Sequence, residues 1–169
     1  MNRFFKGIAI AALIATIAGA GAVLYGLTML APQVESVSVV VTPAAQVPDV
    51  FKDTMSKVQS DTFAGTQFAD ANGLSAEDAS FITYTVRLTN RGFFPAEWIT
   101  LLVESHGADG TGYDVLQLPD ERAQVLPAFS EGDLSATILR AGDASQTARN
   151  MRIVCYVFGQ KVEVAARAN

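Results

Sequence analysis

The sequence predicts an all-β protein: an antiparallel sandwich of about seven strands with a short helical insertion, preceded by one N-terminal transmembrane helix. Three observations predict it. Residues 7–31 are apolar and uncharged, short segments of alternating apolar and polar residues recur over 37–165, and no long helical pattern follows residue 80. We expect a basic N-terminal segment at 1–6 and a β-domain at 32–169, with an insertion at 43–80 that contains a short amphipathic helix.

Residues 7–31 form a run of 25 residues without a charged side chain. As a helix this run is about 37 Å long, which is enough to cross a hydrocarbon core of ~30 Å. Arg3 and Lys6 precede the run, and every Asp and Glu follows it. The positive-inside rule therefore places the N-terminus in the cytoplasm and the β-domain outside, in a single-pass protein of the cell membrane.

The run is longer than the roughly 7–15 apolar residues of a cleavable signal peptide, so we expect a retained signal anchor. Cleavage after small residues such as those at 18–20 is the alternative. Small residues also recur at a spacing of four, which predicts a face on which a second membrane helix can pack closely. That face consists of Gly7, Ala11, Ala15 and Gly19. The other interpretation is that a span rich in Ala and Gly contains such a stripe by chance.

Composition excludes several classes of function. The chain has 169 residues and a net charge of -5, and residues 32–169 contain ten Lys or Arg against seventeen Asp or Glu, a net charge of -7. A nucleic-acid-binding protein normally presents a basic surface, so we expect no nucleic-acid partner. The single Cys excludes an internal disulfide and a multi-Cys metal site, and one His leaves little for metal or acid–base chemistry. We expect no cofactor and no metal.

The strand signals of the β-domain recur at short intervals. Ile82, Tyr84 and Val86 alternate with polar residues, which is typical of a strand with one buried face. Asn90, Arg91 and Gly92 follow as a turn sequence. The expected strands cover residues 37–42, 82–89, 98–103, 115–118, 134–138, 153–158 and 161–165.

The insertion at 43–80 interrupts this rhythm. Val47, Val50, Phe51, Met55 and Val58 recur at helical spacing, with Pro48 and Asp49 as the expected helix start. The segments 98–103 and 153–158 are apolar on both faces, so each needs cover on its outer face. We therefore expect the insertion to form a short amphipathic helix and a loop that cover these two strands.

Residues 84–96 resemble a pattern of bacterial immunoglobulin-like, adhesion-type domains and of the related LEA-type sandwich domains. In that pattern an alternating strand is followed by Asn-x-Gly and then by a second strand. The resemblance implies an immunoglobulin-like sandwich that binds or spaces rather than catalyses, with Trp98 near the core position of such domains. The chain departs from antibody-type domains because Cys155 has no partner Cys.

Two aromatic residues, Phe93 and Phe94, follow the predicted turn and precede Pro95 and Trp98. Exposed aromatic side chains are common anchors for a binding partner, so Phe93 and Phe94 are candidate partner-binding residues. The alternative is that they close the end of the core beside the proline. A contiguous exposed apolar patch at this place would favour the partner surface.

One arrangement suggests catalysis. The order His106, Cys155, Arg167 resembles that of sortase transpeptidases, in which a thiolate attacks, an imidazole acts as acid and a guanidinium stabilises the oxyanion. The residues before Cys155 depart from the sortase pattern Thr-Leu-x-Thr-Cys, and apolar neighbours favour a buried structural thiol. We expect no catalytic residues and keep this triad as the alternative.

The sequence therefore predicts a membrane-anchored extracytoplasmic interaction or structural module of the cell envelope, with a protein partner in the envelope or membrane. Two alternatives remain. One is the sortase-like transpeptidase, and the other is a subunit of a membrane complex assembled through the small-residue face of the helix.

Overall fold

The computed structural model describes residues 12–21, 31–105, 107, 111–118 and 124–168. Within them, strands dominate and every strand pair is antiparallel. The strands are β1 (Gln33–Pro43), β2 (Thr66–Gln67), β3 (Ala79–Asn90), β4 (Ala96–Val103), β5 (Gly112–Leu118), β6 (Gln124–Leu126), β7 (Ser130–Gly142), β8 (Arg149–Val157) and β9 (Gln160–Ala168). All seven expected strands are confirmed. The two additional strands, β2 and β6, are too short for an alternation to be recognised in the sequence.

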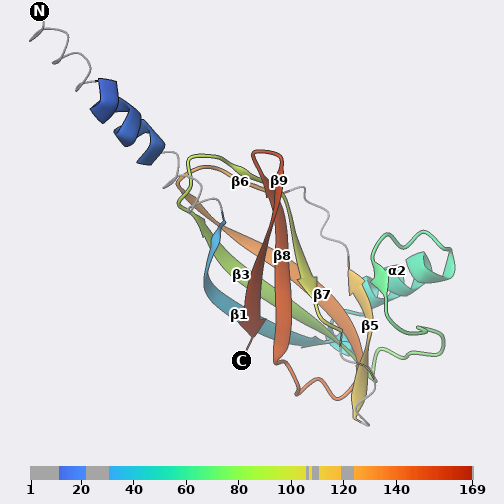
Figure 1. Ribbon diagram of the computed structural model, residues 1–169. Helices are drawn as coiled ribbons and strands as arrows, with labels where there is room; N and C mark the ends of the chain where they lie inside the picture. Colours follow the sequence, from blue (N-terminus) through green and yellow to red (C-terminus); the bar gives the residue numbers. More distant parts are fainter. Residues whose placement is uncertain (1–11, 22–30, 106, 108–110, 119–123, 169) are drawn as a thin grey trace, which may run out of the picture.

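The strands form two sheets that pack face to face as a sandwich (Figure 1). One sheet has the order β1-β3-β7-β5-β2, and the other has the order β6-β4-β8-β9. The prediction of an all-β sandwich is therefore confirmed. Because β8 and β9 are joined by a two-residue turn, the C-terminal segment forms the hairpin expected from the sequence.

The main core lies between the two sheets and follows from the period of two in the strands. Ile82, Tyr84 and Val86 on β3 are fully buried, and they face Leu101 on β4 and Ile153 on β8. The polar residues between them face solvent on the other side of the sheet. Burial of these side chains contributes about 1.5–3 kcal/mol each, so the core is the main source of stability.

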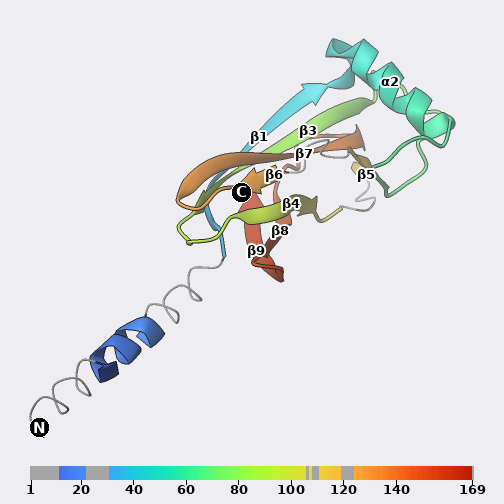
Figure 2. The same ribbon diagram turned by 90° about the horizontal axis from the view of Figure 1, so that it is seen from above.

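A helical layer lies at one end of the sandwich. A short 3-10 helix, η1 (Ala44–Gln46), leads into α2 (Pro48–Gln59), which begins with Pro at its first position as the sequence predicts. Figures 1 and 2 show α2 beyond the end of the sandwich opposite to the start of β1. We call the end at the start of β1 the proximal end, and the end with α2 the distal end.

The expected position of the insertion is wrong. Phe51 of α2 and its neighbours pack on a second hydrophobic cluster with Phe81, Leu116 and Leu139, which belong to the five-stranded sheet. The outer faces of β4 and β8 stay exposed, with Leu102 and Tyr156 about 40% accessible to solvent. The apolar runs misled the prediction because single exposed apolar side chains on a sheet surface are common.

The N-terminal segment is described in part. Residues 12–21 are helical and exposed, whereas 1–11 and 22–30 of the predicted cytoplasmic and membrane segments lie outside the described residues. In the part of the chain that is described, no helix has both the length and the apolar character needed to cross a membrane. Ala15 and Gly19 lie one turn apart on the helix at 12–21, and Gly7 and Ala11 lie outside the described residues.

Candidate contact surface at the proximal end

Large aromatic side chains are exposed together at the proximal end of the sandwich. Their exposed fractions range from 40% to 78%. They come from four places in the chain: the β3–β4 turn, β4, the β6–β7 connection and the β8–β9 turn. We call this group the aromatic end, and its members are Phe93, Phe94, Trp98, Phe129 and Phe158.

The strand register brings these segments together. Ala96, at the start of β4, pairs with Leu126 on one side and with Val157 on the other. The two pairs place the turns that follow β6 and β8 beside the turn that precedes β4. The rings also meet in pairs: Phe93 and Phe129 have centroids 5.2 Å apart in an edge-to-face arrangement, and Phe94 and Phe158 have centroids 5.0 Å apart. Such pairs add roughly 0.5–1.5 kcal/mol beyond area burial.

The buried side chain of Asn90 holds two of these connections together. Its Nδ2 atom donates to the backbone oxygens of Phe94 at 2.8 Å, Pro127 at 3.0 Å and Leu126 at 3.2 Å. Its Oδ1 atom accepts a hydrogen bond from the backbone N–H of Gly92 at 2.9 Å. The amide thus fastens the β3–β4 turn to the segment that leads to Phe129, which gives the aromatic end a defined shape.

Three of the five aromatic residues have backbone conformations that large side chains rarely adopt. Trp98, Phe129 and Phe158 have φ values of 53°, 54° and 50°. Phe158 and Gly159, with φ of 74°, form the two-residue turn between β8 and β9, where Asn-Gly is the favoured sequence. A positive φ costs an L-residue about 1–2 kcal/mol, so these rings are held outward in spite of local strain.

The implied core position of Trp98 is wrong. A bulge in β4 shifts the register between Glu97 and Thr100, and Trp98 within it is 67% exposed. Because the bulge turns two successive side chains outward, Ile99 and Leu101 occupy the core positions of this strand.

Phe93 and Phe94, the predicted partner-binding residues, lie in the exposed aromatic end and do not close the core. Sequence reasoning missed Phe129 and Phe158. The available signal for Phe158 is its place directly before Gly159 between two strand patterns, because a residue in a two-residue hairpin turn has no core to enter. For Phe129 the signal is weaker, since only the preceding Pro127 indicates a turn.

The structure does not bring together Cys155 and Arg167, the two described residues of the sortase-like alternative. His106 lies outside the described residues, Cys155 is fully buried between the sheets, and Arg167 is exposed on β9. Cys155 on β8 pairs with Val162, whereas Arg167 pairs with Asn150. Asn150 lies five residues before Cys155 on β8, so Cys155 and Arg167 are about 17 Å apart along the strand direction. Burial raises the pKa of the Cys155 thiol, which disfavours the thiolate that a nucleophile requires.

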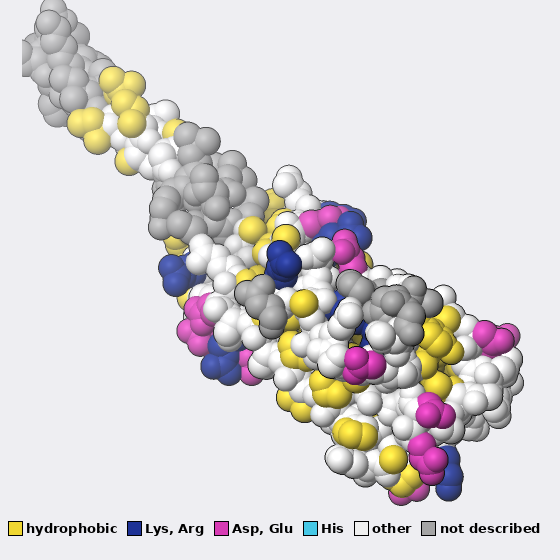
Figure 3. Space-filling model, turned by 90° about the horizontal axis from the view of Figure 1, so that it is seen from below, with side chains coloured by type: hydrophobic (Ala, Val, Ile, Leu, Met, Phe, Trp, Pro, Cys, Tyr) yellow, Lys and Arg dark blue, Asp and Glu magenta, His cyan; other side chains and the backbone are white. Residues whose placement is uncertain are grey.

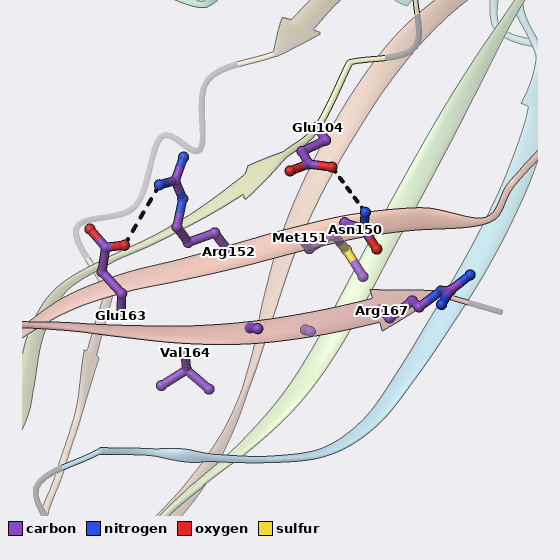
Figure 4. A pocket seen from close by; sticks show the side chains of 9 residues that line it. Glu104, Asn150, Met151, Arg152, Glu163, Val164 and Arg167 are labelled. Atoms are coloured by element: carbon purple, nitrogen blue, oxygen red, sulfur yellow. Dashed lines mark hydrogen bonds and ion pairs between the residues drawn. The ribbon is translucent and has the colours of Figure 1, made fainter.

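Arg167 instead lines a shallow surface hollow of about 600 Å³ over the β8–β9 hairpin (Figure 4). Two polar pairs line the hollow: the Asn150 amide Nδ2 donates a hydrogen bond to Glu104 Oε2 at 3.0 Å, and Arg152 forms an ion pair with Glu163 at 3.6 Å. In Figure 4 the Arg167 side chain points away from these pairs. Exposed polar pairs of this kind are typical of an ordinary solvated surface.

A buried ionic cluster joins the two sheets near the distal end. Asp114 Oδ1 on β5 accepts from Arg140 on β7 at 3.0 Å and from Arg149 on β8 at 3.3 Å, and all three side chains are buried. Backbone oxygens accept further hydrogen bonds from both guanidinium groups. Tyr84 donates to the backbone oxygen of Thr147 at 3.2 Å beside the cluster, and burial raises its pKa. These contacts indicate a structural cluster.

Surface charge differs between the two ends. The insertion at 43–80 contains two Lys against six Asp or Glu, a net charge of -4. On the face shown in Figure 3, acidic side chains gather at the lower right, which is the end with α2, whereas acidic and basic side chains lie together nearer the proximal end. Within the described residues, no group of three or more His, Cys, Asp or Glu side chains is placed to hold a metal ion.

No protein-family model matches this sequence, and no curated protein matches it. The structure defines the protein by class, as a two-sheet β-sandwich with a group of exposed aromatic side chains at one end.

Proposed function

We propose that this chain is a membrane-anchored, extracytoplasmic binding or spacing module of the cell envelope, that its sandwich is of the immunoglobulin-like kind, and that it is not an enzyme. One observation is central to the proposal. The uncharged run at 7–31 ends two residues before β1 begins at Gln33, and Pro32 between them is already buried in the sandwich. A membrane helix joined so directly to a β-domain would keep the domain at a fixed height above the bilayer.

The exposed groups of the domain support binding rather than catalysis. The aromatic end gathers the apolar side chains typical of contact surfaces, including Phe93 and Phe94. The buried thiol of Cys155 and its distance along β8 from the position of Arg167 count against the sortase-like alternative.

The second alternative, a subunit of a membrane complex, is compatible with the anchor. Ala15 and Gly19 are exposed on the helix at 12–21, and a β-carbon added to Gly19 meets no atom within 4 Å. If this face packs on a second membrane helix, Ala15→Leu and Gly19→Leu should abolish co-purification with the partner. Leu13→Ala, on another face, is the matched control, and unchanged assembly in the Leu variants contradicts this alternative.

Fractionation of cells that express the full chain tests the anchor. The protein should stay in the membrane pellet after a carbonate wash, and protease added outside should digest residues 32–169. Release by carbonate, or protection from external protease, contradicts the proposal. Crosslinking in intact cells, followed by identification of the attached protein, then tests the binding role: a reproducible partner in the envelope supports it, and a chain that crosslinks to nothing contradicts it.

A further inference from the structure

The aromatic end lies at the same end of the sandwich as the start of β1. Gln33 pairs with Thr89, one residue before the end of β3, and Ser130 at the start of β7 pairs with Asn90. The turns that present the aromatic rings therefore lie at the same end as the point where the chain enters the sandwich at the start of β1 (Figure 1).

The length of the chain between the run at 7–31 and β1 limits the distance between the proximal end of the sandwich and the bilayer. One residue, Pro32, separates Ala31, the last residue of the run at 7–31, from Gln33, and a fully extended chain spans at most about 7 Å over these two Cα-to-Cα steps. The polar layer on each side of the ~30 Å hydrocarbon core is about 5–8 Å thick. If 7–31 spans the membrane, the proximal end of the sandwich must stand in or directly on the layer of lipid headgroups.

The chemistry of the proximal end suits that layer. Trp is enriched at membrane interfaces, and Phe and Trp are common on the buried faces of proteins that lie in them. The exposed Arg91 lies in the same turn as Phe93 and can reach lipid phosphates while the rings enter the acyl boundary. The rings stay outward although Trp98, Phe129 and Phe158 have strained backbones.

The net charge of the domain indicates which forces can hold the proximal end at the membrane. Residues 32–169 have a net charge of -7, which gives no general attraction to anionic lipids. The most acidic part, the insertion at 43–80, lies at the distal end. Contact at the proximal end must therefore come mainly from burial of the apolar rings, with only a small contribution from Arg91, and should depend little on salt.

We propose that the aromatic end inserts into the headgroup layer of the membrane that residues 7–31 cross. This inference rests on the proposed anchor and adds the surface that the domain binds and its orientation. The sandwich then stands upright on the bilayer. Because β3 has 12 residues, α2 faces away from the membrane at a height of about 40 Å.

The single Trp of the chain is a probe within the proposed contact. The full chain is reconstituted in phosphatidylcholine vesicles, and Trp98 fluorescence is recorded with lipids brominated near the headgroup or near the end of the acyl chain. We expect a blue-shifted emission and stronger quenching by the shallow bromines, with no change on adding salt or phosphatidylserine. Emission typical of water with no quenching overturns the proposal.

Two variants test the rings without altering the probe. Phe93→Ser and Phe129→Ser should each lower about tenfold the ratio of sandwiches with the aromatic end in the headgroup layer to sandwiches with it in water. A tenfold change corresponds to ~1.4 kcal/mol, which is at the low end of the free energy gained by burying a Phe side chain. Val50→Ser on α2 is the matched control, because Val50 is similarly exposed at the distal end. Unchanged quenching in both Phe variants also overturns the proposal.

The outcomes separate this inference from the proposed function. A chain released from the vesicles by carbonate contradicts the anchor itself. A chain that resists carbonate but keeps Trp98 in water leaves the anchor standing and overturns the lipid contact. In that case a protein crosslinked through a photoreactive residue at position 129 would be the occupant of the aromatic end.

Discussion

Trp98 has a backbone conformation that suits Gly or Asn better than Trp. Its φ of 53° lies in the left-handed region, and its side chain is largely exposed. We expect Trp98→Asn to raise the free energy of unfolding by about 1 kcal/mol, because Asn tolerates this conformation and little burial is lost. Urea unfolding followed by circular dichroism measures the change.

Leu101, a buried residue of the same strand, is the control for Trp98. Leu101→Ala should lower the free energy of unfolding by roughly 2–5 kcal/mol, as core truncations do. A comparable loss in Trp98→Asn would show that Trp98 contributes to packing and is not a strained surface residue.

The buried thiol of Cys155 makes stability depend on alkaline pH. Burial raises its pKa above the ordinary value of 9.0. Above that pH the unfolded chain releases the thiol proton while the folded chain retains it, so the free energy of unfolding falls as pH rises through the raised pKa. Below pH 9 this contribution is fully present.

Urea midpoints at about pH 7 and about pH 10 test this dependence. The unmodified chain should lose more stability between the two values than Cys155→Ala, which cannot titrate at this position. An equal loss in both proteins contradicts the prediction. The pKa of Tyr84 is also raised by burial from its ordinary value of 10.0, and its effect on stability at alkaline pH is the same in both proteins, so it cancels in the comparison.

At the scale of single elements, the β3–β4 turn depends on Asn90. Its amide bonds three backbone oxygens and one backbone N–H. We expect Asn90→Ala to cost about 1–3 kcal/mol, because buried backbone groups lose their partner. It should also weaken docking of the aromatic end, since Phe94 and Phe129 lose a common support. Urea unfolding and the Trp98 quenching assay measure the two effects.

Ser75 provides the control for a turn at the distal end. It exchanges hydrogen bonds with Asp78 before β3, and both residues belong to an exposed turn. Ser75→Ala should leave Trp98 quenching unchanged. If Asn90→Ala also leaves quenching unchanged in a folded protein, Asn90 supports the fold and does not position the aromatic end.

At the scale of the whole molecule, the cluster of Asp114, Arg140 and Arg149 joins the sheets. Asp114→Ala removes the carboxylate that both guanidinium groups contact. We expect the free energy of unfolding to fall by about 3–5 kcal/mol, because the buried guanidinium groups of Arg140 and Arg149 then lose the carboxylate that compensates their charge. Thermal and urea unfolding measure it.

Asp133 is the matched surface control for Asp114. It forms a bidentate pair with Arg87, and that exposed pair lowers its pKa. Asp133→Ala should change stability far less, as surface pairs usually do. Equal losses in the two variants would contradict the structural role of the buried cluster.

The sequence by itself determined seven of the nine described strands, the helix α2 and the buried faces of β3 and α2. Alternation at Ile82, Tyr84 and Val86 identifies β3 and its inner face, and the spacing of Val47, Phe51 and Met55 identifies α2, because these patterns depend on local geometry alone. Phe93 and Phe94 could be recognised as candidates since they follow a turn sequence.

Only the tertiary structure decided which of these elements meet. Alternation assigns a face to a strand but not a neighbour, so the placement of α2 on the five-stranded sheet and the outward position of Trp98 could not be predicted. The same holds for the aromatic end, where Phe93 and Phe129 are 36 residues apart in the chain and touch through their rings. Their proximity depends on the pairing of distant strands, which no local pattern records.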